Sequence, residues 1–266
     1  MTADFLTTAL RVRNRYLNLL EAALTGSLYD DPSIASMFSH TIGTYNVNVR
    51  AVGADWPRSA QTMIGRARMR NLRQVCETVL LDNIPGDFLE AGVWRGGACI
   101  FMRAILEAYG DTGRRVFVAD SFKGVPPPTP DIYPADAGDM HHTNEALVVS
   151  RASVEENFRR YGLLDSRVVF LEGWFKDTLP TAPIDQLSVL RLDGDMYEST
   201  IQIFESCYHM VPRGGAVIVD DYNAIKGCAS ATNDFRARHG ITSPILPIDN
   251  IGIWWRIDHE PISATK

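Results

Sequence analysis

The chain has 266 residues, of which 45% are hydrophobic and 22% charged, as is usual for a globular protein with one large domain or a domain with an appendage. Its net charge of -6 argues against a general nucleic-acid binder or a membrane-surface binder, because both need basic patches. The sequence has no apolar run near the roughly 20 residues that span a bilayer and no signal-peptide core, so we expect a cytoplasmic protein that binds neither nucleic acid nor membranes.

The N-terminal part of the chain has a pattern of its own. Residues 1–85 look helical at both ends and irregular in the middle, over residues 29–59. We assign residues 1–65 to a helical and lid segment and residues 66–266 to the main domain. The first helix is amphipathic and lies outside the expected sheet, which favours a homo-oligomer, a dimer or a larger assembly.

From residue 86 onward, strand and helix patterns alternate. Apolar strands are predicted over residues 86–92, 114–122, 166–173, 187–193, 214–221, 243–249 and 252–258. Helices are predicted over residues 98–110, over 153–164 with Ser153 as the cap, and over 222–240. This alternation implies an α/β fold with a doubly wound, mostly parallel sheet of seven strands and helices on both faces. Ligands of such sheets bind outside the carboxyl ends of the strands.

A long loop, residues 122–147, interrupts the alternation and is rich in proline and acidic residues. Loops of this length inside a compact domain are mostly lids or binding loops. We expect this loop and the irregular N-terminal stretch to cover the active site. His141 and His142 lie in the loop and are candidate bases or substrate contacts, although loop histidines are more often neither.

The stretch "FLEAGVWRGGACIF", residues 88–101, reads as a strand, a glycine turn and the start of a helix. Its pattern is E-x-G-x-x-x-G-G, which is neither the dinucleotide motif G-x-G-x-x-G nor a P-loop. Glu90, two residues before Gly92, suits a ligand that carries a positive charge such as an amino group. The plain alternative is an ordinary turn between a strand and a helix.

Two further strands end in residues that suit a nucleoside. Asp120, 28 residues after Gly92, ends the second strand and can accept both ribose hydroxyls. Gly173 and Trp174 follow the third strand, where a flat apolar side chain can cover a purine. Asp120 as a turn residue and Trp174 as a core residue remain open.

Four aspartates end the fourth and fifth strands, in "VLRLDGDMYEST" and "AVIVDDYN". Carboxylates brought together at strand ends repel one another unless a cation or a shared proton compensates. Hard oxygen ligands favour Mg²⁺, Ca²⁺ or Mn²⁺ over zinc. Candidate ligands are Asp193, Asp220 and Asp221, with Asp195 close by. Tyr197 and Tyr222 flank the acids and are candidates to line the substrate site or to pack at helix starts.

These stretches, together with "VFVADSFKGVP" and "NFRRYGLLDSRVVFLEGWFKDTLPTAP", closely resemble the macrocin O-methyltransferase family over residues 62–257. Members of that family methylate sugar hydroxyls of antibiotic glycosides, including macrolide deoxysugars and the noviose of aminocoumarins. The resemblance implies the class I, Rossmann-like methyltransferase fold, S-adenosyl-L-methionine as methyl donor and Mg²⁺ as metal. The substrate it implies is a small-molecule glycoside.

The resemblance also implies roles for individual residues. Glu90 and Gly92 frame the methionine portion of the donor, and Asp120 binds its ribose. The cofactor-binding set that it implies is Thr62, Met63, Glu90, Gly92, Arg95, Gly96, Asp120, Ser121, Lys123, Gly173 and Trp174. The implied metal ligands are Asp193, Asp220 and Asp221, and the implied general base is Asp195.

Three alternatives stay open at this point. A catechol-type O-methyltransferase uses the same metal clamp on a vicinal diphenol. A nucleotide-binding oxidoreductase is disfavoured by the missing G-x-G-x-x-G and by the acidic cluster. A non-catalytic cofactor-binding partner has no need of Asp195.

Overall fold

The computed structural model describes residues 3–35 and 42–262 of the chain, so part of the irregular stretch 29–59, residues 36–41, lies outside the described residues. Its centre is a seven-stranded sheet of order β5-β4-β3-β6-β7-β9-β8. The strands are β3 (Asp87–Ala91), β4 (Val116–Asp120), β5 (Val168–Glu172), β6 (Leu187–Leu192), β7 (Ala216–Val219), β8 (Leu246–Pro247) and β9 (Ile253–Arg256). All seven predicted strands are present, and each is shorter than its apolar pattern because the ends form turns.

The sheet is parallel from β5 to β7, and β9 runs antiparallel between β7 and β8. The chain builds outward from β3 through β4 to β5, then returns to the other side of β3 for β6 and β7. The switch point of the topology therefore lies between β3 and β6, where α/β sheets bind their ligands. Both of these strands are buried along their whole length, as expected for a central pair of a parallel sheet.

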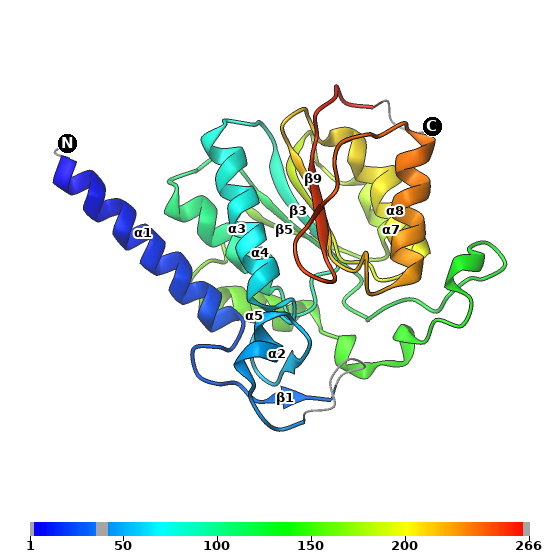
Figure 1. Cartoon of the computed structure of the whole chain (residues 1–266), viewed down its shortest axis with the longest axis horizontal. Coiled ribbons are helices and arrows are strands. Elements are labelled where there is room, and N and C mark those ends of the chain that lie inside the picture. Colours follow the sequence, from blue (N-terminus) through cyan, green and yellow to red (C-terminus); the bar gives the residue numbers. More distant parts are fainter. Residues whose placement is uncertain (1–2, 36–41, 263–266) are drawn as a thin grey trace.

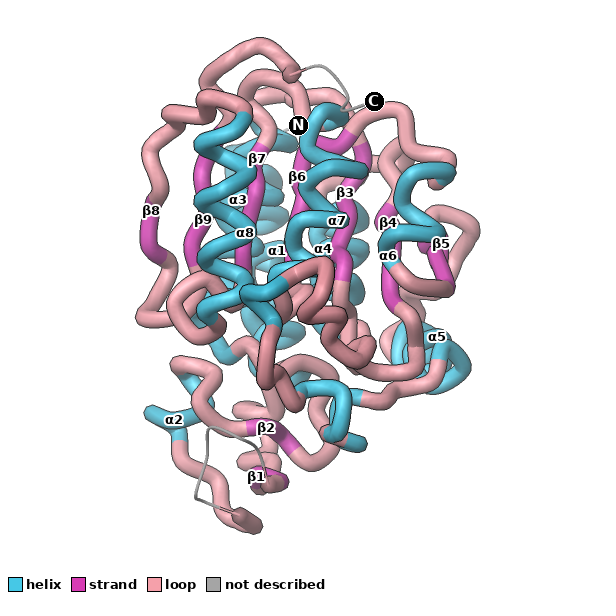
Figure 2. The backbone as a smooth tube through the Cα atoms, turned by 90° about the vertical axis from the view of Figure 1, so that its right-hand side faces the viewer, coloured by secondary structure: helices cyan, strands magenta, loops and turns pink. Residues whose placement is uncertain are grey.

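Helices cover both faces of the sheet (Figures 1 and 2). On one face lie α1 (Ala3–Leu24), α3 (Gly65–Leu81) and α4 (Gly97–Ala108), and on the other lie α6 (Phe175–Thr178), α7 (Tyr197–Cys207) and α8 (Lys226–Arg238). Each face has its own buried apolar cluster. The helix α5 (Arg151–Arg160) lies beside β5 and adds Val154 and Phe158 to the first cluster.

Two predicted helix starts are wrong. Ser150, not Ser153, caps α5, because the Ser150 Oγ accepts a hydrogen bond from the Ser153 N–H at 3.2 Å. The last helix, α8, begins at Lys226 instead of residue 222. The intervening residues form a turn in which the N–H groups of Ala224 and Ile225 both donate to the Asp221 carbonyl. That turn holds Asp221 at the end of β7.

Smaller elements lie at the carboxyl edge of the sheet. A two-stranded sheet of β1 (Ser33–Ile34) and β2 (Trp56–Pro57) and the short α2 (Val47–Ala51) sit below the main sheet in Figure 2. The long loop 122–147 contains three short 3₁₀ turns at Pro134–Asp136, His141–Thr143 and Glu145–Leu147. Within the described ranges, every helix is too short or too polar to cross a lipid bilayer.

Candidate active site

A cavity of about 450 Å³ opens at the carboxyl edge of the sheet. That volume is within the range of small-molecule sites. It is lined by the ends of β3 to β7, by the N-terminal segment around Thr62, and by both ends of the long loop. The predicted residues that line it are Thr62, Met63, Glu90, Gly92, Asp120, Ser121, His141, Gly173, Trp174, Asp193, Asp195, Asp220 and Asp221.

Three of the predicted cofactor residues lie outside this lining. Arg95 donates from Nη1 to the carbonyls of Pro57 and Ala60, at 3.0 and 2.9 Å, and so pins the segment that leads to Thr62. Gly96 begins α4 with a left-handed backbone, φ 82°. The Lys123 side chain is exposed.

Three of the predicted substrate residues also lie outside the lining. The Tyr197 hydroxyl donates to Asp234 at 3.0 Å, and the Tyr222 hydroxyl donates to Asn233 at 2.9 Å. Both tyrosines are thereby directed to α8. His142 is half-buried in the 3₁₀ turn beside His141 and does not line the cavity.

Gly92 lies where the end of β3 meets the end of β6, between the predicted cofactor residues and the aspartates. Its backbone is left-handed, φ 88°, and a Cβ there would lie 1.7 Å from the carbonyl oxygen of Asp193. Glycine is therefore the residue that lets the end of β3 approach the end of β6 this closely. The Asp193 N–H donates to the Ala91 carbonyl at 2.9 Å across the same junction.

Asp120 has both oxygens engaged by backbone groups. Oδ2 accepts from the Val93 N–H at 2.8 Å, and Oδ1 accepts from the Phe122 N–H at 2.7 Å. Burial raises the pKa of Asp120, and these hydrogen bonds oppose the rise. Each carboxylate oxygen keeps a second lone pair, so the side chain can still accept hydrogen bonds from a ligand in the cavity.

Arg191 was not predicted from the sequence, and it contacts acidic side chains at the ends of three strands, β3, β6 and β7. It lies on β6 opposite Glu90 of β3, and its guanidinium contacts Glu90, Asp220 and, at 2.9 Å, Asp193. Burial raises the pKa of Glu90 to about 7, and the charge of Arg191 opposes the rise. The only sequence signal was a single arginine within the apolar run "VLRLD".

A second buried arginine, Arg68 of α3, was missed as well. It contacts the other oxygen of Asp220 and lies 3.2 Å from Asp249. Asp220 is thus held between two guanidinium groups. Truncating either arginine leaves a buried carboxylate with one cation fewer, which is costly in a dry site.

Asp193, Asp220 and Asp221 each offer an oxygen, and these oxygens lie within 4.8 Å of one another. The Asp221 Oδ2 is buried and accepts no hydrogen bond from any described residue. Burial and the charge of Asp193 hold the pKa of Asp221 well above its ordinary value. Three hard oxygen donors, one of them unpartnered, fit a divalent cation such as Mg²⁺.

Asp195 lies between this cluster and the start of α7. It has a left-handed backbone, φ 58°, which costs a non-glycine residue on the order of 1–2 kcal/mol. Burial and the charge of Asp193 raise the pKa of Asp195 to about 7. Backbone strain of this kind, at a titratable side chain in a cavity, is typical of functional residues.

The long loop is fastened to the helix that follows Asp195. The buried Asp136 accepts hydrogen bonds from the N–H groups of Tyr197 and Glu198, at 2.7 and 2.8 Å, and so caps α7. The Thr129 hydroxyl donates to Glu198 at 2.6 Å. Sequence reasoning missed this cap because the capping residue comes from 61 residues upstream.

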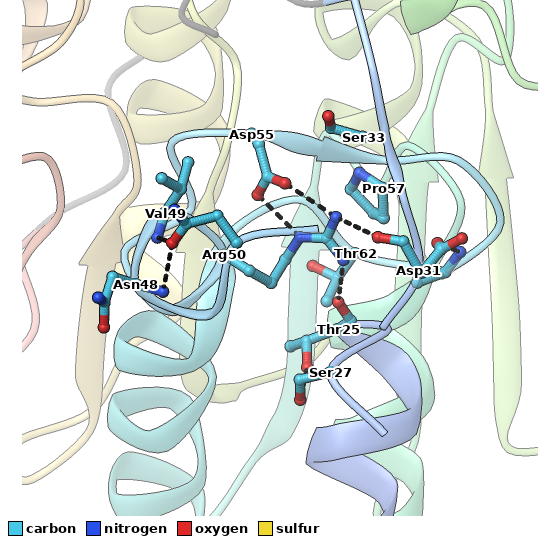
Figure 3. Close-up of polar contacts among 12 residues, drawn as sticks. Thr25, Ser27, Asp31, Ser33, Asn48, Val49, Arg50, Asp55, Pro57 and Thr62 are labelled. Carbon is cyan, nitrogen blue, oxygen red and sulfur yellow. Dashed lines mark hydrogen bonds and ion pairs between the residues drawn. The ribbon is translucent and has the colours of Figure 1, made fainter. Parts of the chain in front are cut away.

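The N-terminal segment is organised around Arg50, which is fully buried (Figure 3). Its guanidinium binds both oxygens of Asp55, at 2.8 and 2.9 Å, and donates to the carbonyls of Thr25 and Asp31, each at 2.8 Å. These contacts join the end of α1 to the stretch that leads to Thr62. The Thr62 N–H itself donates to the Leu24 carbonyl at 3.0 Å.

Comparison with known proteins connects this geometry to a family. The sequence model of the family described as Macrocin-O-methyltransferase (TylF) matches residues 13–257. Demethyldecarbamoylnovobiocin O-methyltransferase of Streptomyces niveus is 50% identical over 91% of this chain and 92% of its own. A tetracenomycin glycoside 4'-O-methyltransferase of Streptomyces olivaceus is 49% identical over 95% of each chain.

Among solved structures, the O-methyltransferase NovP superposes with a TM-score of 0.88 at 47% identity, covering 93% of this chain and 100% of that one. The fold is therefore the class I S-adenosylmethionine-dependent methyltransferase fold, as the sequence predicted.

Proposed function

The chain belongs to the macrocin O-methyltransferase family, and from this premise we propose that it transfers a methyl group from S-adenosyl-L-methionine to a hydroxyl of a deoxysugar on a glycosylated antibiotic. The aminocoumarin noviose and macrolide sugars are the substrates we favour. One observation carries the proposal: a single cavity is lined by the acid and glycine residues of β3 to β5 and by the four aspartates after β6 and β7.

The methyl donor is proposed to lie across the ends of β3, β4 and β5. Glu90 and Gly92 receive its methionine portion, and Asp120 accepts from its ribose. Ser121, Gly173 and Trp174 adjoin the adenosine, and Thr62 and Met63 close over it. Three predicted cofactor residues lie outside the lining and are proposed to position the segments around the donor: Arg95, Gly96 and Lys123.

Asp193, Asp220 and Asp221 are proposed to hold Mg²⁺. When bound, the ion supplies Lewis acidity, which lowers the pKa of a coordinated sugar hydroxyl. Asp195 is the proposed general base and removes the hydroxyl proton as the methyl group moves, a role that contributes roughly 10²–10⁴-fold. Fixing hydroxyl and donor in one orientation contributes on the order of 7–11 kcal/mol.

Several features around the cavity receive roles of their own. We assign residues 1–65 and the loop 122–147 to the covering of the bound ligands, with His141, His142, Tyr197 and Tyr222 as candidate substrate contacts.

On α1, which projects from the body in Figure 1, Leu6, Leu10 and Leu19 are about half exposed, which supports a homo-oligomer. The four cysteines are buried and unpaired, which supports a reducing, cytoplasmic location.

The test begins with calorimetric titration of S-adenosylhomocysteine into the protein. Methyl transfer is then measured onto demethyldecarbamoylnovobiocin, a desmethyl tetracenomycin glycoside and a macrolide glycoside, each with Mg²⁺ and with EDTA. The expected result is binding followed by Mg²⁺-dependent methylation of a sugar. Methylation of a catechol but of no glycoside makes the enzyme a catechol-type methyltransferase instead. Turnover that resists EDTA removes the metal role from the aspartates.

A further inference from the structure

His141 is held in one orientation by a neighbouring carboxylate. Its Nδ1 lies 2.7 Å from Asp139 Oδ2, and its backbone N–H donates to Asp139 Oδ1 at 2.8 Å. A carboxylate accepts hydrogen bonds, so it selects the tautomer with the proton on Nδ1 and leaves Nε2 as an acceptor. This pair is built like the oriented bases of many enzymes, in which a third group fixes the ring.

The other ring nitrogen is free for a ligand. Nε2 of His141 is buried and has no hydrogen-bond partner among residues 3–35 and 42–262. A buried acceptor without a partner is costly, so an arrangement of this kind is stable mainly where a ligand or proton meets it. The His141 side chain lines the same cavity as Asp195.

Methyl transfer releases one proton, which must leave the site before the next turnover. The hydroxyl O–H bond breaks, an O–C bond forms, and the S–C bond breaks, with its electron pair returning to sulfur. A cationic sulfonium and a neutral alcohol thus give a neutral thioether, a neutral ether and one proton. This proton is released in the cavity that the His141 side chain lines.

We propose that His141 accepts this proton at Nε2 and passes it to solvent, with Asp139 as the positioning residue of the ring. The inference rests on the proposed function of the site. Asp139 contacts the ring at Nδ1, and the charged side chains that line the same cavity are Arg68, Glu90, Asp120, Lys176, Asp193, Asp195, Glu198, Asp220 and Asp221. The His141 side chain is 14% exposed, which gives the proton an exit.

The test compares His141→Asn with His239→Asn, a matched control because the His239 Nε2 is also buried and without a partner among the described residues but His239 does not line the cavity. His141→Asn is expected to lower kcat about 10²-fold, at the lower end of the range for a positioned proton acceptor, with KM and S-adenosylhomocysteine affinity near wild type. Imidazole is expected to restore part of the rate of His141→Ala. His239→Asn is expected to keep kcat.

Asp139→Asn tests the positioning role. Losing the carboxylate removes the acceptor that fixes the ring, so Asp139→Asn is expected to lower kcat with KM near wild type and to give both ring tautomers of His141 in ¹H–¹⁵N spectra. Unchanged kcat, or a His141 ring that keeps its proton on Nδ1 alone in Asp139→Asn, contradicts the positioning role.

The ring can also be observed without turnover. Long-range ¹H–¹⁵N spectra of the free wild-type protein are expected to show His141 with its proton on Nδ1, and a proton on Nε2 overturns the inference. Wild-type kcat and pH profile in His141→Asn overturn it as well. Failure of the wild type to methylate any glycoside is a different result, because it refutes the proposed function itself.

Discussion

Replacing Gly92 by alanine tests the close approach of the end of β3 to the end of β6, because these ends carry predicted cofactor residues and aspartates. The added Cβ would lie 1.7 Å from the Asp193 carbonyl oxygen, whereas ordinary contact begins near 3.4 Å, so the two strand ends must separate by about 1.7 Å. That displacement takes the Asp193 N–H, now 2.9 Å from the Ala91 carbonyl, out of hydrogen-bonding range.

The cost can be separated into two parts with a matched control. Gly110 is also left-handed, φ 69°, but a Cβ there meets nothing within 4 Å. Gly110→Ala therefore loses only the left-handed preference, about 1–2 kcal/mol. Gly92→Ala loses the same amount plus a buried hydrogen bond worth about 1 kcal/mol, before any strain in the sheet is counted.

Thermal unfolding of the two variants measures the difference, since 1 kcal/mol corresponds to about 2–4 °C in a chain of this size. Gly92→Ala is expected to melt below Gly110→Ala by at least that amount. It should also lose at least about 10²-fold in methyl transfer, because a 1 Å misplacement of reacting groups costs that much. Equal melting temperatures and equal activities would refute the close approach of β3 and β6.

Three other changes address single groups. Asp195→Asn is expected to bind S-adenosylhomocysteine as the wild type does but to lose about 10²–10⁴-fold in kcat; a near-wild-type rate contradicts the base assignment. Asp221→Ala is expected to weaken Mg²⁺ activation and turnover together, and an unchanged Mg²⁺ titration removes Asp221 from the metal site. The Arg103 guanidinium holds the pKa of Asp165 at about 2, below its ordinary 3.8, so this pair stabilises the fold above about pH 4 and the contribution disappears as pH falls toward 2. The difference in urea midpoint between wild type and Asp165→Asn should therefore shrink between pH 4 and pH 2, and a constant difference contradicts the assignment.

The strands and the acids at their ends were predictable because both are local signals. An apolar run followed by Asp193 or by Asp220 and Asp221 identifies a buried strand and the side chains at its carboxyl end. Parallel pairing then brings those ends to one edge of the sheet. The prediction of a doubly wound, mostly parallel sheet of seven strands follows from the same alternation and from the family resemblance, whereas the order of the strands is seen only in the structure.

The groups that neutralise and hold those acids were not predictable. Arg191 meets Glu90 only because β6 pairs with β3 in one particular register, and a single sequence does not contain that register. Arg68 reaches Asp220 across 152 residues of chain. Ser150 and Ser153 both offer a hydroxyl, and the sequence pattern does not distinguish which of them caps α5.

The cap that Asp136 places on α7 has a consequence for redesign of substrate scope. The loop 122–147 is the obvious segment to exchange between relatives that modify different glycosides, because it borders the cavity and its outer parts are exposed. Asp136 and Thr129 nevertheless support the first turn of the helix directly behind Asp195. A grafted loop that lacks these two side chains brings a new recognition surface but releases the helix turn that follows Asp195, the proposed base. Chimeras should therefore vary the loop around fixed residues 129 and 136 and leave those anchor points to the recipient protein.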